Sequence, residues 1–144
     1  MQLAPPIAVG GRLWTEVDYI DMQNALTILV VDDEFTVRRW VSQLLQRSGY
    51  SVLEAHSGPD AIRVSDQHHG PIDLLLSDIL MPGGMTGDEV AAILKRLRPT
   101  MKVVLMSGYH QNVIAGETSW PFIPKPFQSA TLIERVKHAL AEDH

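Results

Sequence analysis

The sequence predicts an α/β fold in which one parallel β-sheet carries helices on both faces. From about residue 25 onward, short runs of Val, Ile and Leu alternate with stretches that have helical spacing. Several of these runs are apolar almost throughout, which is typical of strands buried on both faces. The resulting order is β-α-β-α-β-α-β-(short α)-β-α, and such alternation favours right-handed crossovers between parallel strands.

Composition narrows the class of protein. A chain of 144 residues with 45% apolar content suits one domain with a packed core. The net charge of -5 shows no excess of Lys and Arg of the kind that nucleic-acid-binding domains carry, so we expect no direct contact with nucleic acid. The absence of cysteine fits a reducing compartment. No apolar run is long enough to span a membrane and no signal peptide is visible, so a cytoplasmic location without membrane contact is expected.

Five segments are expected to form the strands. They are rich in Val, Ile and Leu, and the first, third and fourth are nearly continuous apolar runs. The segments are residues 26–31, 52–55, 72–77, 102–106 and 121–123.

The first two expected helices follow from an apolar stripe and a cap. The first helix ends at Gly49, and the second begins after Ser57, a plausible N-cap, and reaches about Gln67. The stripe of the first helix comprises Val37, Trp40, Val41, Leu44 and Leu45.

The last two expected helices are also predicted from apolar residues at helical spacing, and the first of them from a cap as well. Thr86 and Glu89 have the spacing of a capping box, and Pro99 stops the helix that they begin. Its shared face consists of Val90, Ile93, Leu94 and Leu97. The final helix follows Phe127 and repeats apolar residues at four-residue intervals, namely Leu132, Val136 and Leu140.

Residues 1–25 differ in character from the domain expected over residues 26–144. The stretch "APPIAVGG" resembles a linker, whereas residues 12–23 could form one amphipathic helix. An ordered tail without a function of its own is an equal alternative. These residues are therefore expected to be an N-terminal extension or linker.

Polar residues end the predicted strands at one edge of the sheet. Asp32 and Asp33 end the first strand and Asp78 ends the third, while Ser107 ends the fourth and Lys125 follows the fifth. Ligands of open α/β sheets bind at the carboxyl ends of the strands, and in the strand order 2-1-3-4-5 strands one and three are neighbours. We therefore expect the three aspartates to converge.

Three converging carboxylates require a positive partner, because their mutual repulsion would raise their pKa values. Oxygen ligands without Cys or a nearby His favour Mg²⁺. A lysine and a hydroxyl beside the metal suit phosphoryl transfer, in which a carboxylate oxygen attacks phosphorus and cations neutralise the phosphoryl oxygens.

Four motifs in order, each after a predicted strand, resemble the response-regulator receiver domain of two-component signalling. They are "ILVVDDE", "LLLSDILMPG", "VLMSGY" and "PKPF", and the resemblance covers residues 26–141. It implies a flavodoxin-like (βα)5 fold, a doubly wound parallel five-stranded sheet of order 2-1-3-4-5. It also implies Mg²⁺-dependent phosphorylation of one aspartate by a phosphohistidine on a sensor histidine kinase or a histidine phosphotransfer protein.

The resemblance assigns the acidic and metal-binding positions. Asp78 matches the phosphoacceptor and also binds the metal, and Asp33 matches the direct metal ligand. Asp32 matches the outer acidic residue, which reaches the metal through water, and the backbone carbonyl of Leu80 matches the third protein ligand.

The resemblance also assigns the positions that respond to the phosphoryl group. Ser107 matches the hydroxyl switch residue and Lys125 the lysine of the pocket. Phe122 falls at the switch aromatic position, although a plain core role is equally open, and Pro126 fits a cis-proline position. Leu80 and Tyr109 match the positions that flank the path of the hydrolytic water, which implies slow loss of the phosphoryl group.

Two segments depart from the commonest family pattern. The loop between Pro82 and Gly87 is one residue longer, as in receivers attached to hybrid histidine kinases. The segment from Ser107 to Lys125 is shorter than usual and contains Gly116, which predicts a short or irregular fourth helix. Because the chain ends just after the last helix, it is expected to be a stand-alone receiver or part of a larger protein such as a hybrid kinase.

Other functions remain open from the residues alone. A phosphohydrolase similar to the haloacid dehalogenases would carry its phosphate on Asp32, but that class has Asp where this chain has Glu34. A degenerate receiver that only binds partners is a third possibility. The preferred hypothesis is a signalling receiver that catalyses only its own phosphorylation and dephosphorylation, with a weak homodimer possible.

Overall fold

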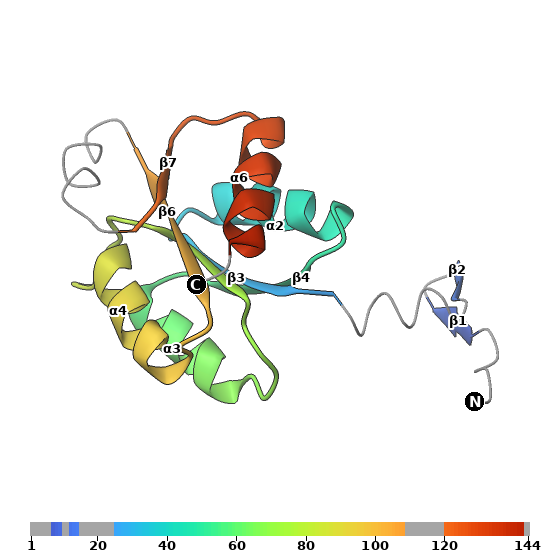
Figure 1. Cartoon of the computed structure of the whole chain (residues 1–144), viewed down its shortest axis with the longest axis horizontal. Coiled ribbons are helices and arrows are strands. Elements are labelled where there is room, and N and C mark those ends of the chain that lie inside the picture. Colours follow the sequence, from blue (N-terminus) through green and yellow to red (C-terminus); the bar gives the residue numbers. More distant parts are fainter. Residues whose placement is uncertain (1–6, 10–11, 15–24, 109–119, 143–144) are drawn as a thin grey trace.

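The computed structural model describes residues 7–9, 12–14, 25–108 and 120–142. Its main sheet has five parallel strands in the order β4-β3-β5-β6-β7 (Figure 1). This order is the predicted 2-1-3-4-5 arrangement of a flavodoxin-like fold. The strands are β3 (Thr27–Val31), β4 (Ser51–Ala55), β5 (Leu74–Asp78), β6 (Lys102–Ser107) and β7 (Phe122–Pro124).

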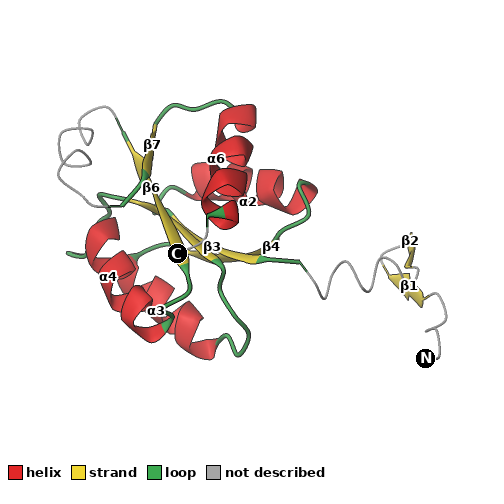
Figure 2. Cartoon of the chain, in the orientation of Figure 1, coloured by secondary structure: helices red, strands yellow, loops and turns green. Residues whose placement is uncertain are grey.

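Helices cover both faces of this sheet, with α3 and α4 on one face and α2 and α6 on the other (Figure 2). Each strand contributes side chains to both faces of the sheet, because successive side chains along a strand point to opposite sides. In β3, Leu29 and Val31 pack with α3 and α4, whereas Ile28 and Val30 pack with α2 and α6. The helices are α2 (Phe35–Arg47), α3 (Gly58–Gln67), α4 (Gly87–Leu97) and α6 (Ser129–Ala141).

The expected helix caps are present. The Ser57 hydroxyl accepts a hydrogen bond from the backbone N–H of Asp60 and so caps α3. Thr86 and Glu89 form a complete capping box at the start of α4. Helix α2 ends before Gly49, whose positive φ of 97° a side chain would disfavour.

The N-terminal segment contradicts one expectation. Strands β1 (Ile7–Val9) and β2 (Arg12–Trp14) form a separate antiparallel hairpin, so the helix predicted for residues 12–23 is wrong at its first three residues. Gly10 and Gly11 separate these two short segments, and a Gly-Gly pair between two strand-forming segments is a hairpin signal. The rest of that predicted helix, and the short fourth helix predicted near Gly116, lie outside the described residues.

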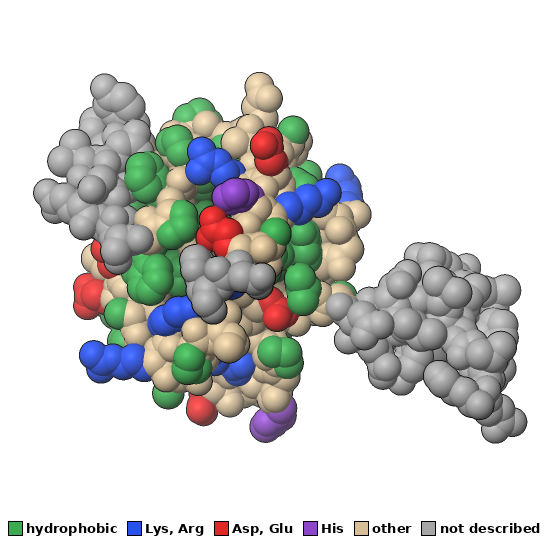
Figure 3. Space-filling model, in the orientation of Figure 1, with side chains coloured by type: hydrophobic (Ala, Val, Ile, Leu, Met, Phe, Trp, Pro, Cys, Tyr) green, Lys and Arg blue, Asp and Glu red, His purple; other side chains and the backbone are tan. Residues whose placement is uncertain are grey.

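Figure 3 shows Lys and Arg side chains scattered among acidic and apolar ones on the visible face of the described residues. In the described part of the chain, none of the helices combines the length and the apolar composition needed to cross a bilayer.

Candidate functional site

The register of the sheet brings the carboxyl ends of the strands to one level. Val31 pairs with Ser77, so Asp32 and Asp78, one residue further along each strand, leave the sheet side by side. Asp78 pairs in turn with Met106, immediately before Ser107. The convergence predicted from the sequence therefore follows from strand order and strand length.

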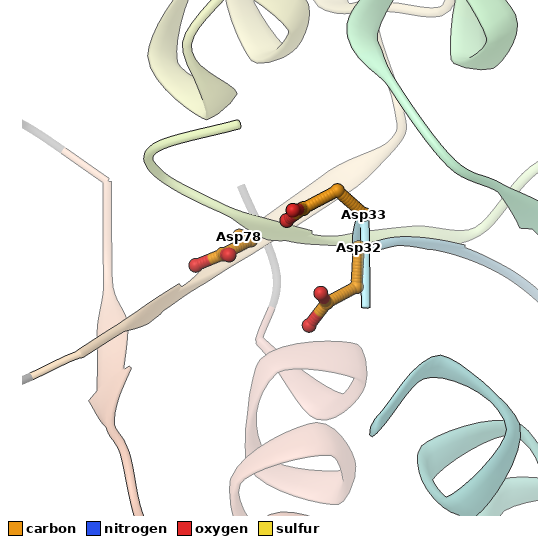
Figure 4. A group of neighbouring side chains, drawn as sticks. All are labelled: Asp32, Asp33 and Asp78. Carbon is orange, nitrogen blue, oxygen red and sulfur yellow. The ribbon is translucent and has the colours of Figure 1, made fainter. Parts of the chain in front are cut away.

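Three carboxylates meet at this edge. Asp32, Asp33 and Asp78 each place an oxygen within 4.8 Å of the others, and Figure 4 shows them gathered at the ends of β3 and β5. Asp32 is fully buried and Asp78 is 5% exposed, whereas Asp33 faces solvent. Such a set of hard oxygen donors, with no His or Cys in the cluster, fits a magnesium ion.

Lys125 supplies a positive charge within the cluster. Its ammonium donates a hydrogen bond of 2.9 Å to Asp32 Oδ2 and lies 3.6 Å from Asp78 Oδ2. Burial alone would lower the pKa of Lys125, but the hydrogen bond to Asp32 and the negative charges of Asp78 and Asp32 raise it. The lysine is therefore held as a cation. The peptide bond between Lys125 and Pro126 is cis, as expected.

The surroundings of Asp78 disfavour the charge of its carboxylate. Burial raises its pKa to about 6, and the negative charges of Asp32 and Asp33 add to the rise. Lys125 and the backbone N–H of Ile79 act in the opposite direction but do not offset the burial. The site thus has an excess of negative charge that a divalent cation would compensate.

Asp32 has both side-chain oxygens engaged. Its Oδ1 accepts a hydrogen bond of 2.9 Å from the backbone N–H of Glu34, and its Oδ2 accepts the bond from Lys125. Asp32 therefore accepts from the N–H of Glu34, the residue that precedes α2. Its backbone carbonyl accepts a further bond of 2.8 Å from Arg38.

The remaining predicted residues lie around the carboxylates. Ser107 is fully buried at the end of β6, and its backbone carbonyl accepts a hydrogen bond from the N–H of Lys125. Leu80 is 40% exposed just beyond Asp78. Phe122 is half-buried and packs against the core on the α3–α4 face. Tyr109 lies outside the described residues.

The loop after Asp78 is closed by a backbone contact. The N–H of Gly87 donates a hydrogen bond of 2.7 Å to the carbonyl of Ile79, and a Cβ on Gly87 would lie 2.3 Å from the carbonyl oxygen of Asp78. Gly83 and Gly84, in the longer loop noted in the sequence, have φ values of 98° and 84°. The glycines therefore let α4 begin directly against the strand end that carries Asp78.

Comparison with known proteins decides the family. The family model described as "Response regulator receiver domain" matches residues 28–137. The chain belongs to the response-regulator receiver family. The receiver core thus coincides with the segment that holds all the clustered aspartates, Ser107 and Lys125.

Individual relatives agree with this assignment. This receiver is 34% identical over 124 residues to the sensor kinase CckA of Brucella abortus, covering 83% of this chain and 13% of that protein. It is also 34% identical to the transcriptional regulatory protein ResD of Bacillus subtilis, covering 84% of this chain and 50% of that protein. The chain therefore spans half or less of the length of these relatives.

Solved structures confirm the fold. The receiver domain of the hybrid histidine kinase CckA superposes with a TM-score of 0.67 and 38% identity, covering 79% of this chain and 98% of that one. A response-regulator receiver protein from Sinorhizobium medicae gives a TM-score of 0.71 and 30% identity, covering 82% and 96% of the two chains.

Two residues that touch this receiver's site were not identified from the sequence. For Gly87 the sequence offers only its position at the end of the loop, because the close approach of its backbone to Asp78 depends on how α4 packs against β5. Arg38 was not singled out. Its position six residues after Asp32, in the first turns of α2, was the available signal, since a long side chain there can return to the end of β3.

Proposed function

We propose that this receiver accepts a phosphoryl group on Asp78 from a phosphohistidine, with Mg²⁺ held by the neighbouring carboxylates. The observation that carries the proposal is the cluster itself, in which three carboxylate oxygens within 4.8 Å lie beside the Lys125 ammonium. Phosphoryl transfer depends mainly on positioning and on charge neutralisation, and these residues supply both.

Each residue of the cluster has a separate role in the proposed reaction. An oxygen of Asp78 attacks phosphorus, the bond between phosphorus and the donor imidazole breaks, and the imidazole nitrogen recovers a proton from solvent. Lys125, 3.6 Å from Asp78, faces the phosphoryl oxygens as they gain charge. Ser107 donates its hydroxyl to one of them.

The metal would be held by Asp33 and Asp78 directly and by Asp32 through water, with the backbone carbonyl of Leu80 as the third protein ligand. When bound, Mg²⁺ supplies positive charge to the phosphoryl oxygens and offsets the repulsion among the carboxylates. Its proposed place is supported by the raised pKa of Asp78, caused mainly by burial and reinforced by Asp32 and Asp33.

The surface around the cluster supports a protein donor. Phe35 and Leu80 each follow a cluster aspartate by two residues in the sequence and are 67% and 40% exposed. Trp40, further along α2, is 42% exposed. An apolar groove of about 350 Å³ opens beside Lys125 and contains Trp40 and Phe127, whose rings stack at 5.9 Å. Apolar surface at such a position favours a docked protein, here a sensor histidine kinase or a histidine phosphotransfer protein.

The proposed output is a small two-state shift. Ser107 would move toward the phosphoryl oxygens, and Phe122, which is only half-buried, would move into the space that opens. Amide exchange of the free protein and of a beryllofluoride complex tests this. Changes are expected in residues 107–123, and changes confined to residues 78–87 would contradict the route.

The alternative, a phosphohydrolase that uses Asp32, is less well supported. Both oxygens of Asp32 are already engaged, one by the N–H of Glu34 and one by Lys125, and the residue is fully buried. Asp78 has an oxygen facing Lys125 at the longer distance of 3.6 Å and is the better placed nucleophile.

Intact-mass spectrometry after incubation with acetyl phosphate tests the proposal as a whole. One added phosphoryl group per chain is expected with Mg²⁺, and none with EDTA in its place. Equal modification under both conditions would contradict the metal-dependent reaction.

A further inference from the structure

Arg38 makes the contact on which this inference depends. Its Nη1 donates a hydrogen bond of 2.8 Å to the backbone carbonyl of Asp32. That carbonyl belongs to the peptide bond between Asp32 and Asp33, the two carboxylates that precede α2. The orientation of this peptide plane sets the direction in which both side chains leave the backbone.

The guanidinium of Arg38 is itself held in place. Its Nε donates to Glu54 Oε1 at 3.2 Å, and its central carbon lies 5.5 Å from the centre of the Phe35 ring. The side chain is 13% exposed, so little water competes for these contacts. Glu54 belongs to the neighbouring strand β4, which means that Arg38 connects α2, the end of β3 and β4.

We infer that Arg38 is a positioning residue for the metal-binding pair Asp32 and Asp33. It acts through the peptide that joins them and is anchored by Glu54, and the inference rests on the magnesium site proposed above. An arginine suits the task because its separate N–H groups reach both acceptors at once, whereas the single ammonium of a lysine cannot span them.

Charge and geometry make opposite predictions for the loss of Arg38. Removing a positive charge near three carboxylates would strengthen the binding of a cation, whereas releasing the peptide would weaken it. Partners that hold metal ligands in place commonly contribute about tenfold or more to metal affinity, so geometry is expected to dominate. Arg38→Lys separates the two effects, because it keeps the charge and loses the two-acceptor contact.

Arg39 provides a matched control. It is the next residue of α2 and also pairs with Glu54, but in the described part of the chain it makes no hydrogen bond to Asp32. Arg39→Lys therefore makes the same Arg-to-Lys change beside the same partner, Glu54, without affecting the peptide between Asp32 and Asp33.

The experiment is calorimetric titration of Mg²⁺ into the full chain, with folding of each variant checked by circular dichroism at the same temperature. Arg38→Lys should weaken Mg²⁺ affinity by about tenfold, and Arg39→Lys should leave it within about twofold. Glu54→Ala, which removes the anchor but keeps Arg38, should weaken it by a smaller factor. This last variant also provides the test if Arg38→Lys does not fold.

The outcomes separate this inference from the proposed function. If the parent binds Mg²⁺ and both Arg38→Lys and Glu54→Ala bind equally well, Arg38 is not a positioning residue and only this inference fails. Equal weakening by Arg38→Lys and Arg39→Lys also overturns it, since a general effect of the ion-pair cluster would then suffice. If the parent itself binds no Mg²⁺, the proposed metal site and this inference fail together.

Discussion

The Lys125 ammonium lies closer to Asp32 than to Asp78, at 2.9 Å and 3.6 Å respectively. The lysine is thus anchored on the fully buried aspartate and faces the proposed phosphoacceptor without neutralising it fully. In the proposed reaction, Asp32 would keep the Lys125 ammonium in place before phosphorylation, and the ammonium would then turn toward the new phosphoryl oxygens.

Lys125→Gln should slow phosphorylation by acetyl phosphate by about 100-fold, because a preorganised donor to the developing charge is lost. Mg²⁺ affinity should be kept or increased, since a competing positive charge leaves Asp32. Quenched mass spectrometry at several times gives the rate. Lys137→Gln on α6 is the control and should react as the parent does. A normal rate for Lys125→Gln would show that the ammonium is not needed.

Asp78→Asn should stabilise the metal-free protein at neutral pH. The pKa of Asp78 is raised to about 6, so its neutral form stabilises the folded state fully below about pH 4 and this contribution is lost as pH rises through 6. The stability difference between variant and parent should therefore grow from near zero at pH 4 to at most about 3 kcal/mol at pH 8.

Urea unfolding in EDTA over this pH range measures that difference. A difference that does not change with pH, or a variant less stable than the parent at pH 8, would contradict the burial of an ionised Asp78. Added Mg²⁺ should reduce the difference by stabilising the parent, because ligand binding to the folded state adds to its stability.

Gly87→Ala should disturb the strand end that carries Asp78. The new Cβ would lie 2.3 Å from the Asp78 carbonyl oxygen, a contact that only backbone movement relieves. We expect a loss of about 3 kcal/mol in the free energy of unfolding, together with slower phosphorylation. Gly84→Ala is the control, because it has open space around its Cβ and only an unfavourable φ of 84°.

Gly84→Ala should cost about 1 kcal/mol through backbone strain alone and leave the Asp78 backbone in place. Denaturant unfolding measures both variants. If Gly87→Ala and Gly84→Ala lose the same free energy of unfolding, the close approach of Gly87 to Asp78 does not contribute to stability.

Leu80→Asn should shorten the lifetime of the phosphoryl group. Leu80 is 40% exposed beside Asp78 and offers no polar group that could orient a hydrolytic water, whereas an amide can do so. Phosphate release at fixed Mg²⁺ after removal of the donor gives the rate. A rate equal to or slower than that of the parent would show that the Leu80 side chain does not set the lifetime.

Much of this fold was predictable because local patterns and topology agree. Strand β3 is buried at every position because both its faces are covered, and all of its residues after Thr27 are apolar. Asp32 follows at the point where the core ends. Given the strand order, the convergence of Asp32 with Asp78 needed no further information. The Ser57 and Thr86 caps were also predictable, since a cap depends on residues only three apart.

What the sequence did not predict depends on side chains that cross between elements. The bond from Arg38 to the Asp32 carbonyl requires Glu54 on another strand to hold the guanidinium, and no local pattern encodes that. Trp40 belongs by its spacing to the apolar stripe of α2, but it is 42% exposed and stacks on Phe127 in the groove beside Lys125.

The central claim, that Asp78 is the phosphoacceptor, is tested most directly by locating the phosphoryl group. The parent, Asp78→Asn and Asp32→Asn would each be incubated with acetyl phosphate and Mg²⁺, and the acyl phosphate converted with hydroxylamine into a stable hydroxamate for peptide mass spectrometry. The hydroxamate is predicted on Asp78 in the parent and, in lower amount, in Asp32→Asn, and it should be absent from Asp78→Asn. A hydroxamate on Asp32, or undiminished labelling of Asp78→Asn, would contradict the assignment.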